Sequence, residues 1–249
     1  MGQTRSPLGV DDLEQVAARG WRARDEDALG DWLLRADSGF TNRANSALVV
    51  GDPGMPLPAA VGAVTAWYEA RGLAPCVQLP GVGSRAADAA FAAAGWARDE
   101  DVLVLTAPIG VAPPAVPVEL AGTPDEAWLA GYRYRGADLP SGAVEVLTNA
   151  EDAVFASVRL APAPAPLAAV ARGVLTDGWL GVTAVTVAEE HRRQGLASAV
   201  MAALQRWAGE RGAHSVYLQV TAGNAPARAL YRRAGFIEHH RYHYRRRVD

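Results

Sequence analysis

Residues Val185 to Ala197 read V-T-V-A-E-E-H-R-R-Q-G-L-A, and the organisation of the 249-residue chain follows from this stretch. The residues that lead into it, Trp179 to Val187, are rich in Val and Thr, which predicts a β-strand. The residues that follow carry apolar side chains at helical spacing, which predicts a helix over Leu196 to Trp207. The stretch is therefore expected to contain the end of a strand, a tight polar turn and the first turn of a helix.

The turn from Arg192 to Ala197 has the composition of an anion-binding site. The first turn of a helix has backbone N–H groups without partners and carries the positive end of the helix dipole. Phosphate groups are favourable ligands for such a turn. Gly195 allows a ligand to approach the backbone closely, and Arg192 and Arg193 add positive charge. These features predict a binding site for a pyrophosphate.

The motif Arg192-x-x-Gly195-x-Ala197 resembles the acetyl-CoA signature of the GNAT acetyltransferases, (Q/R)-x-x-G-x-(G/A). The run N-A-P-A-R-A-L-Y-R-R-A-G-F, which ends at Phe236, is similar to a second GNAT motif at the usual distance. The order of predicted strands and helices over residues 116–246 is also similar to the GNAT order. The resemblance implies an α/β fold with a mixed sheet and an N-acetyltransferase that uses acetyl-CoA as co-substrate.

The resemblance also implies where acetyl-CoA would lie. It would occupy the gap where two parallel strands, Val182–Val187 and Ser215–Gln219, separate. Backbone groups of Val185 and Val187 would pair with the pantetheine chain like an added strand. The amides of the turn would bind the pyrophosphate. The implied cofactor-binding residues are Val185, Val187, Arg192, Arg193, Gln194, Gly195, Leu196, Ala197, Asn224 and Ala227.

Tyr231 is the catalytic residue that the resemblance implies, because its phenol could protonate the departing thiolate. The alternative role is an aromatic side chain packed on the sheet. A backbone N–H near Val187 would stabilise the oxyanion. The general base stays open, because the predicted strand Trp179–Ala188 contains no acidic residue, and Glu189, Glu190 and Asp177 are expected in turns. The remaining candidates are positioned water and the side chains of His239, His240 and His243.

Composition limits the class of protein. Half of the chain is hydrophobic, which is enough to bury a sizeable core, and the formal net charge of -3 gives no argument for nucleic-acid binding. Met1 to Val10 lacks the apolar core of a signal peptide, and no apolar stretch is long enough for a membrane span. Cys76 is the only cysteine, which excludes an intrachain disulfide. We expect a cytoplasmic enzyme without a metal site.

The first half of the chain looks like a degenerate copy of the second half. Ala63–Gly72 matches Ala203–Gly212 at an offset of 140, and the same offset aligns Phe91 with Tyr231. Repeats at a fixed offset suggest a duplicated unit, although alanine-rich helices also match easily by composition. The proline-rich segment Pro108–Pro117 marks the expected boundary. We therefore predict a degenerate GNAT-like accessory half over residues 1–110 and a catalytic GNAT domain over residues 111–249.

The first half lacks the residues that would bind a phosphate. The offset places Asp52 and Pro53 where Arg192 and Arg193 stand. An aspartate repels a phosphate, and a proline has no N–H to donate. We therefore expect one acetyl-CoA site per chain, with the first half covering the catalytic half and shaping its substrate cleft.

The expected function is transfer of an acetyl group from acetyl-CoA to a primary amine of a small molecule, an amino acid or a protein. One alternative is an amino-acid N-acetyltransferase of the glutamate type, in which Arg133 and Arg135 would hold a carboxylate. A second alternative is a non-catalytic acyl-CoA sensor, which the missing acidic residue favours and Tyr231 disfavours. No nucleic-acid or membrane partner is expected.

Three local predictions are specific enough to check. Leu29–Ala36 is expected to be one strand, and Ala44–Val50 another. Thr123 is expected to cap a helix that begins at Pro124.

Overall fold

The computed structural model describes residues 8–132, 138–162 and 164–248. The first half contains α1 (Val10–Gly20), β1 (Asp25–Leu29), β2 (Trp32–Ala36), the 3-10 helix η1 (Asn42–Ala44), β3 (Ala47–Leu48), α2 (Leu57–Glu69), β4 (Cys76–Pro80), α3 (Arg85–Ala93), β5 (Ala97–Arg98) and β6 (Val102–Pro108). The second half contains β7 (Glu119–Ala121), α4 (Glu126–Gly131), α5 (Ala143–Thr148), β8 (Ala153–Val158), β9 (Ala169–Thr176), β10 (Trp179–Val187), the 3-10 helix η2 (Glu189–His191), α6 (Leu196–Gly209), β11 (Ser215–Thr221), α7 (Ala225–Arg233) and β12 (Ile237–Arg246).

The described strands form one mixed sheet that continues through both halves of the chain. Its order is β1-β2-β3-β4-β12-β6-β11-β10-β9-β8-β7, and β5 pairs with β12 beside this path. Two neighbouring pairs are parallel, β3 with β4 and β10 with β11, while the other pairs are antiparallel. The prediction of an α/β fold with a mixed sheet is confirmed.

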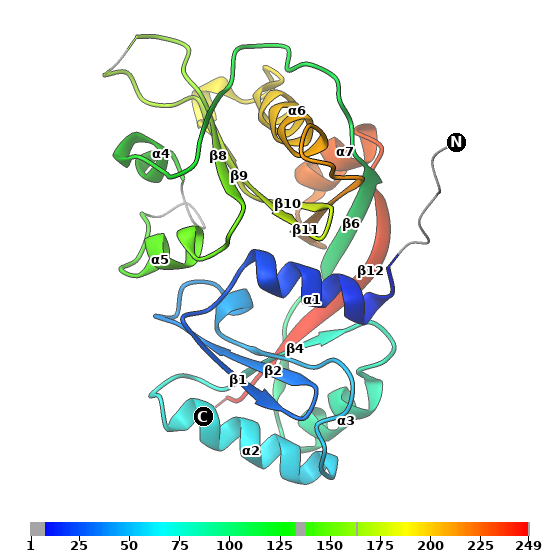
Figure 1. The fold of residues 1–249 in the computed structure, drawn as a ribbon. Coiled ribbons are helices and arrows are strands. Elements are labelled where there is room, and N and C mark those ends of the chain that lie inside the picture. Colours follow the sequence, from blue (N-terminus) through cyan, green and yellow to red (C-terminus); the bar gives the residue numbers. More distant parts are fainter. Residues whose placement is uncertain (1–7, 133–137, 163, 249) are drawn as a thin grey trace.

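The last strand of each half pairs with the other half. β6 lies between β11 and β12 and pairs with both. On its other edge, β12 pairs with β4 over residues 242–246. Figure 1 shows β6 and β12 running side by side from the upper to the lower part of the molecule, where β12 ends near the C-terminus. Neither half therefore completes its sheet from its own strands.

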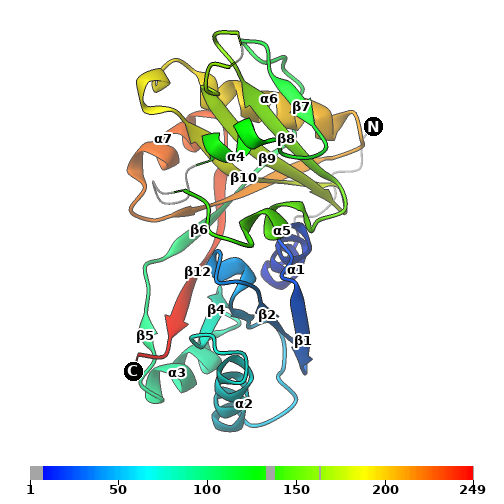
Figure 2. The ribbon, with the colours of Figure 1, turned by 90° about the vertical axis from the view of Figure 1, so that its left-hand side faces the viewer.

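Helices cover the two faces of the second half differently. α6 packs on β8, β9 and β10, and its buried side chains form the largest core cluster with those strands and β11. α4 packs against β9 on the other face, and α1 contacts β9, β10 and β4. Figure 2 shows α1 and α5 side by side between the upper and lower parts. α1 thus covers the middle of the sheet, where the two halves meet.

Several elements recur at the same offset in the two halves. α3 and α7 begin and end 140 residues apart, and α2 and α6 end 140 residues apart. β4 and β11 hold equivalent places in the sheet, each beside the other half's last strand. The free cysteine, Cys76, is buried on β4, where burial raises the pKa of its thiol to about 12.

The prediction of one strand over 29–36 was wrong, because a turn at Gly30 divides it into β1 and β2. Gly30 has a φ of 59°, and an added Cβ atom would lie 2.4 Å from the carbonyl oxygen of Asp52. The strand predicted over 44–50 is reduced to Ala47–Leu48. The side chain of Asn45 binds backbone groups of residues 37, 39, 40 and 41 and holds the preceding chain in a loop.

The predicted helix cap at Thr123 was also wrong. Asp125 caps α4, because its Oδ1 accepts a hydrogen bond of 2.7 Å from the N–H of Trp128. The helix therefore begins two residues later than predicted, at Glu126. Within the described ranges, no helix combines the length and the apolar composition that crossing a membrane requires.

Candidate functional site

β10 and β11 pair only over the first part of their length. Their parallel register runs from Trp179 opposite Ser215 to Val182 opposite Leu218. Beyond this point β10 continues along β9 to Val187, and β11 continues along β6 to Thr221. The facing edges of the two strands then have no backbone partner in the described parts of the chain, as the GNAT resemblance implies for the acetyl-CoA site.

A β-bulge lies where the two strands separate. Ala184 has a φ of 55°, and the register between β10 and β9 shifts between Thr183 and Thr186. Bulges of this kind change the direction in which the following residues point. After the bulge, the N–H of Ala188 donates to Ala168 O at 2.9 Å. By strand alternation the N–H of Val187 points to the opposite edge, toward the gap.

The turn after β10 presents a row of free amides. Arg193 has a φ of 65° and Gly195 a φ of 81°, and Gly195 is the N-cap of α6. Among the described residues, no acceptor is bonded to the backbone N–H groups of 193–198. An added Cβ atom at Gly195 would meet nothing within 4 Å, so the space beside it is open. Successive N–H groups in a turn at a helix N-terminus form an anion-binding concavity.

A cavity of about 1040 Å³ joins this turn to α7 and to the free edge of β10. It is lined by all of the residues predicted to bind acetyl-CoA except Gln194, and also by Tyr231. The side chain of Gln194 instead donates a 3.4 Å hydrogen bond to the carbonyl of Glu190. The charged residues that line the cavity are the three arginines Arg192, Arg193 and Arg233. The charged side chains around the cavity are therefore all positive.

Tyr231 projects from α7 into the wall of this cavity and is 8% exposed. Burial raises the pKa of its phenol above the usual 10.0, so the hydroxyl is protonated at neutral pH. Its ring lies 5.8 Å from that of Phe236, which anchors α7 to the sheet. Asn224 also lines the cavity, but its Oδ1 caps α7 by accepting a hydrogen bond from the N–H of Ala227.

The acidic and histidine side chains named as candidate bases from sequence all lie outside the lining of this cavity. Glu189 pairs with Arg192 at the exposed turn, and Asp177 pairs with Arg19. The three histidines lie on β12, at a separate cavity of about 510 Å³ on the first half. His239 bonds Leu8 and His240, His240 bonds Glu14, and His243 bonds Asp88. None of these candidate bases is therefore positioned to take a proton inside the cavity beside Tyr231.

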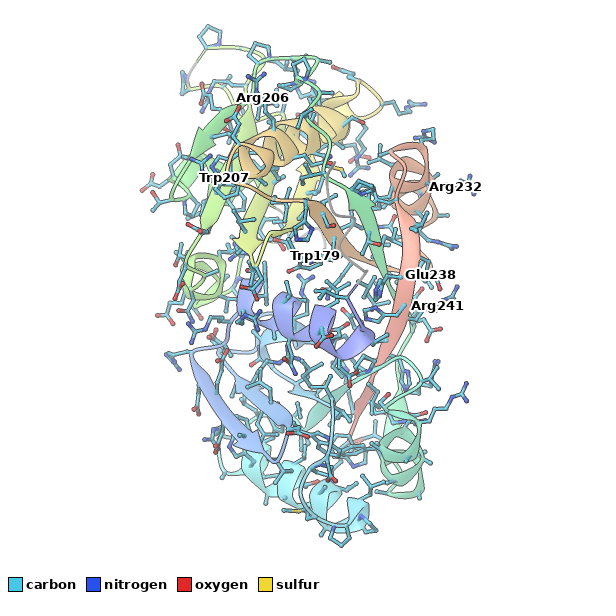
Figure 3. The ribbon with its side chains drawn as sticks, turned by 45° about the vertical axis from the view of Figure 1, so that its right-hand side comes forward. Trp179, Arg206, Trp207, Arg232, Glu238 and Arg241 are labelled. Atoms are coloured by element: carbon cyan, nitrogen blue, oxygen red, sulfur yellow. The ribbon has the colours of Figure 1, made fainter. Side chains whose placement is uncertain are left out.

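Other charged side chains lie on the surface, on α7 and β12. Figure 3 shows Arg232 on α7 and Glu238 and Arg241 on β12 along one edge of the molecule, away from Trp207 on α6. Glu238 accepts a hydrogen bond of 2.6 Å from Nε of Arg241, and this bond lowers the pKa of its carboxyl. Glu238 and Arg241 are thus paired with one another at the surface. No group of three or more metal-binding side chains occurs within the described residues.

A buried guanidinium on β9, next to the strand that borders the gap, was not among the residues predicted from the sequence. Arg172 lies on β9, directly opposite Thr183, and is completely buried. The sequence does contain a sign of this residue, because Arg172 is the only charged residue in the apolar run from 167 to 175. The bulge at Ala184 had no signal, since no glycine stands there. Arg133 and Arg135, proposed to hold a carboxylate, lie outside the described residues.

Comparisons with known proteins show which family the chain resembles. Residues 9–245 match the family model described as "Probable histone acetyltransferase Rv0428c C-terminal". The chain is 27% identical to the uncharacterized N-acetyltransferase YobR of Bacillus subtilis over 94% of this chain and 96% of that protein. It is 30% identical to the probable histone acetyltransferase Rv0428c of Mycobacterium tuberculosis over 93% of this chain and 72% of that protein.

Solved structures show the same fold. A GCN5-related N-acetyltransferase from Kribbella flavida superposes with a TM-score of 0.71 at 20% identity, covering 98% of this chain and 97% of that chain. A tandem GNAT protein from the clavulanic acid biosynthesis pathway superposes with a TM-score of 0.59 at 18% identity, covering 97% and 88%.

Proposed function

The chain belongs to the Rv0428c C-terminal family of GNAT-type acyltransferases, and we propose that it transfers the acetyl group of acetyl-CoA to a primary amine. The observation that carries this proposal is the continuity of three features in one cavity. These are the free amides of 193–198, the unpaired edge of β10 and the hydroxyl-bearing ring of Tyr231. Their order suits a ligand with a pyrophosphate at one end and an acyl group at the other.

Each part of the cavity has a proposed task in holding acetyl-CoA. The N–H groups of 193–198 donate hydrogen bonds to the pyrophosphate oxygens, with Arg192 and Arg193 beside them. The exposed edge of β10 at Val185 and Val187 offers backbone groups to the two amides of the pantetheine arm. Ala197 and Ala227 are small, so they leave room along the arm between α6 and α7.

Acetyl-CoA supplies an activated thioester to this site. The acceptor nitrogen forms a bond to the thioester carbon, and the carbon–sulfur bond then breaks. The N–H of Val187 points toward the gap and is placed to stabilise the oxyanion. Tyr231 donates its proton to the departing thiolate and regains one from solvent. The proton lost by the amine passes to water, because no acidic or histidine side chain lines this cavity among the described residues.

We also propose that the first half is a degenerate GNAT-like unit with no acetyl-CoA site. The cavity beside α2 and α3 measures only about 190 Å³, and Trp32 forms part of its wall. The amides of the equivalent loop are used internally. Asp52 N–H donates to Asp31 Oδ2 at 2.9 Å, and Gly54 N–H donates to Asp52 Oδ1 at 2.8 Å. Two carboxylates thus fill the place that a phosphate would take.

An amine screen tests the proposed function against the sensor alternative. Purified protein is incubated with acetyl-CoA and a panel of amino acids, polyamines and a histone tail peptide, since one relative is named for a histone acceptor. Free CoA thiol is measured, and the acetylated product is identified by mass spectrometry. Turnover with at least one acceptor supports the enzyme. Tight acetyl-CoA binding without turnover on any amine would favour the sensor.

A further inference from the structure

A polar row crosses the face of the sheet opposite to α6. The residue after Arg172, Gly173, faces α6, because an added Cβ atom there would lie 3.0 Å from Leu204. Side chains alternate between faces along a strand, so Arg172 points to the other face. Thr183 lies directly opposite Arg172 in the β9–β10 register and shares that face. Gln219 of β11 follows Leu218, the last residue paired with β10, and continues the row.

Two polar atoms in this row lack partners. Arg172 donates from Nε to Leu147 O at 2.7 Å and from Nη1 to Gly20 O at 3.0 Å. Its Nη2 and the Oγ1 of Thr183 are both buried, and neither has a hydrogen-bond partner among the described residues. Leaving a buried donor or acceptor unsatisfied is costly, and more so for a charged group. The two atoms belong to directly opposite residues on the same face of the sheet.

A second guanidinium stands beside the first. Arg43 of the segment η1 lies 4.5 Å from the ring of Trp21, and Arg172 lies 5.0 Å from the same ring. Arg43 donates to Gln219 Oε1 at 3.0 Å. Unlike Arg172, it is only partly buried.

These two positive charges have no carboxylate partner within the described residues. Carbonyls near the ends of α1 and α5 offset part of the charge of Arg172, while the partner of Arg43 is a neutral amide. Burial lowers the pKa of Arg172 to about 9, with Arg43 also contributing, so the group is still charged at neutral pH. Two guanidinium groups therefore lie at the Trp21 ring without a carboxylate from the described chain to neutralise them. A bound anion would be stabilised beside them.

The position of these two guanidinium groups relative to the acetyl-CoA cavity suggests that they contact the acceptor amine. The cavity proposed for acetyl-CoA lies along α6 and α7, and the gap between β10 and β11 opens at Val182 and Leu218. Acetyl-CoA would fill its own side of the gap. An amine that attacks the thioester carbon would therefore approach from the opposite face, where the polar row lies.

Resting on the proposed acetyl transfer, we propose that the acceptor amine carries a carboxylate, which Arg43, Arg172 and Thr183 bind on this face of the sheet. Arg43 meets the carboxylate at the accessible end of the row, and the free N–H group of Arg172 and the Thr183 hydroxyl hold it from beneath. A lysine-rich protein tail would be repelled by the same two guanidinium groups.

Matched pairs of acceptors test this proposal. The series from glycine to 6-aminohexanoate is compared with the corresponding carboxamides, using free-thiol release at saturating acetyl-CoA. The wild type is expected to have a KM about 10- to 100-fold lower for the best carboxylate than for its carboxamide, as for a hydrogen-bonded charge. Arg43→Gln should raise the KM for the carboxylate by that factor and leave the carboxamide unchanged. Thr183→Val, which keeps the shape of the side chain, should give a smaller change of the same kind.

Arg206→Gln serves as the matched control, because Arg206 is exposed on α6 and pairs with Glu210. It should not change the preference, and the melting temperature of each variant shows whether the fold is retained. The proposal would be overturned by equal KM values for acid and amide or by a preference for a lysine-rich peptide. It would also be overturned if the preference for the carboxylate survived in both Arg43→Gln and Thr183→Val.

A failure of acetyl transfer itself is recognised separately, because no acceptor of either kind would then release thiol. In that case 4-aminobutyrate is titrated calorimetrically into wild type and Arg43→Gln in the presence of CoA. Binding by the wild type that Arg43→Gln loses supports the anion site, whereas equal or undetectable binding in both overturns it.

Discussion

Nε2 of His240 lies 2.7 Å from Oε1 of Glu14, and the two side chains are only 4% and 2% exposed. Glu14 belongs to α1 at the start of the chain and His240 to β12 near its end. The other carboxylate oxygen of Glu14 accepts a hydrogen bond of 2.7 Å from Gln78 on β4. This buried contact therefore ties together the three elements that meet where the two halves share one sheet.

Replacing Glu14 is expected to destabilise the whole molecule. Glu14→Ala removes the hydrogen-bond partner of two buried nitrogens, Nε2 of His240 and Nε2 of Gln78, and each buried group left unsatisfied costs about 1–3 kcal/mol. Urea unfolding of wild type and variant measures the loss. Glu210→Ala is the control, because the Arg206–Glu210 pair is exposed and should contribute less than about 1 kcal/mol. A loss for Glu14→Ala as small as that of the control would show that the contact is not a structural tie.

Gly195→Asp is expected to abolish acetyl-CoA binding while the fold survives. The side chain would occupy the open space beside the amides of 193–198, and its charge would repel the pyrophosphate. Gly54→Asp is a matched control, because Gly54 also has a positive φ, of 73°, and lies in the equivalent loop of the first half. Calorimetry should detect normal binding in the control and none in Gly195→Asp. Equal affinities in both variants would remove the turn from the site.

Tyr231→Phe is expected to lower turnover and leave the affinity for acetyl-CoA nearly unchanged. The ring and its packing on Phe236 are kept, while the proton donor is lost, which typically costs about 10²- to 10⁴-fold in kcat. Because burial raises the pKa of Tyr231 above 10.0, its ionisation should not limit the wild-type rate between pH 6 and 9. Rates of both proteins are compared across that range with an acceptor from the amine screen. Full turnover by Tyr231→Phe would make it a packing residue.

One acetyl-CoA is expected to bind per chain. The second half offers a cavity of about 1040 Å³ with free amides, while the first half offers about 190 Å³ with amides bound to Asp31 and Asp52. Calorimetric titration gives the stoichiometry directly. A value of two sites per chain would mean that the first half binds the co-substrate despite its carboxylates.

Residues 111–249 are expected not to fold as a separate domain. Without the first half, β11 and β12 lose β6, which lies between them and pairs with both. Unpaired strand edges of this kind lead to aggregation. The fragment should be insoluble alone and become soluble when co-expressed with residues 1–110, as measured by size-exclusion chromatography. A monomeric fragment that binds acetyl-CoA by itself would contradict this expectation and favour two independent domains.

The local parts of the candidate site could be predicted from sequence. Strand propensity before the turn and helical spacing after it fixed β10 and α6, and Gly195 adopts the positive φ that its residue type allows. The second motif likewise forms α7, with Asn224 at its N-terminus. These features depend on interactions between residues a few positions apart. The amino-acid order alone is therefore sufficient to specify them.

Other parts depended on which distant residues the sheet brings together. The histidines of β12 were candidate bases by sequence, but pairing of β12 with β6 and β4 places them at a separate cavity that first-half residues also line. Arg43 and Arg172 are 129 positions apart, yet both lie against the ring of Trp21. A one-residue change of register would move Arg172 to the other face of the sheet. The sequence by itself determined the turn that we propose to bind the pyrophosphate. Only the tertiary structure decided which charges lie on the face proposed for the acceptor, because strand register and the exchange of β6 and β12 are set by contacts across the whole chain.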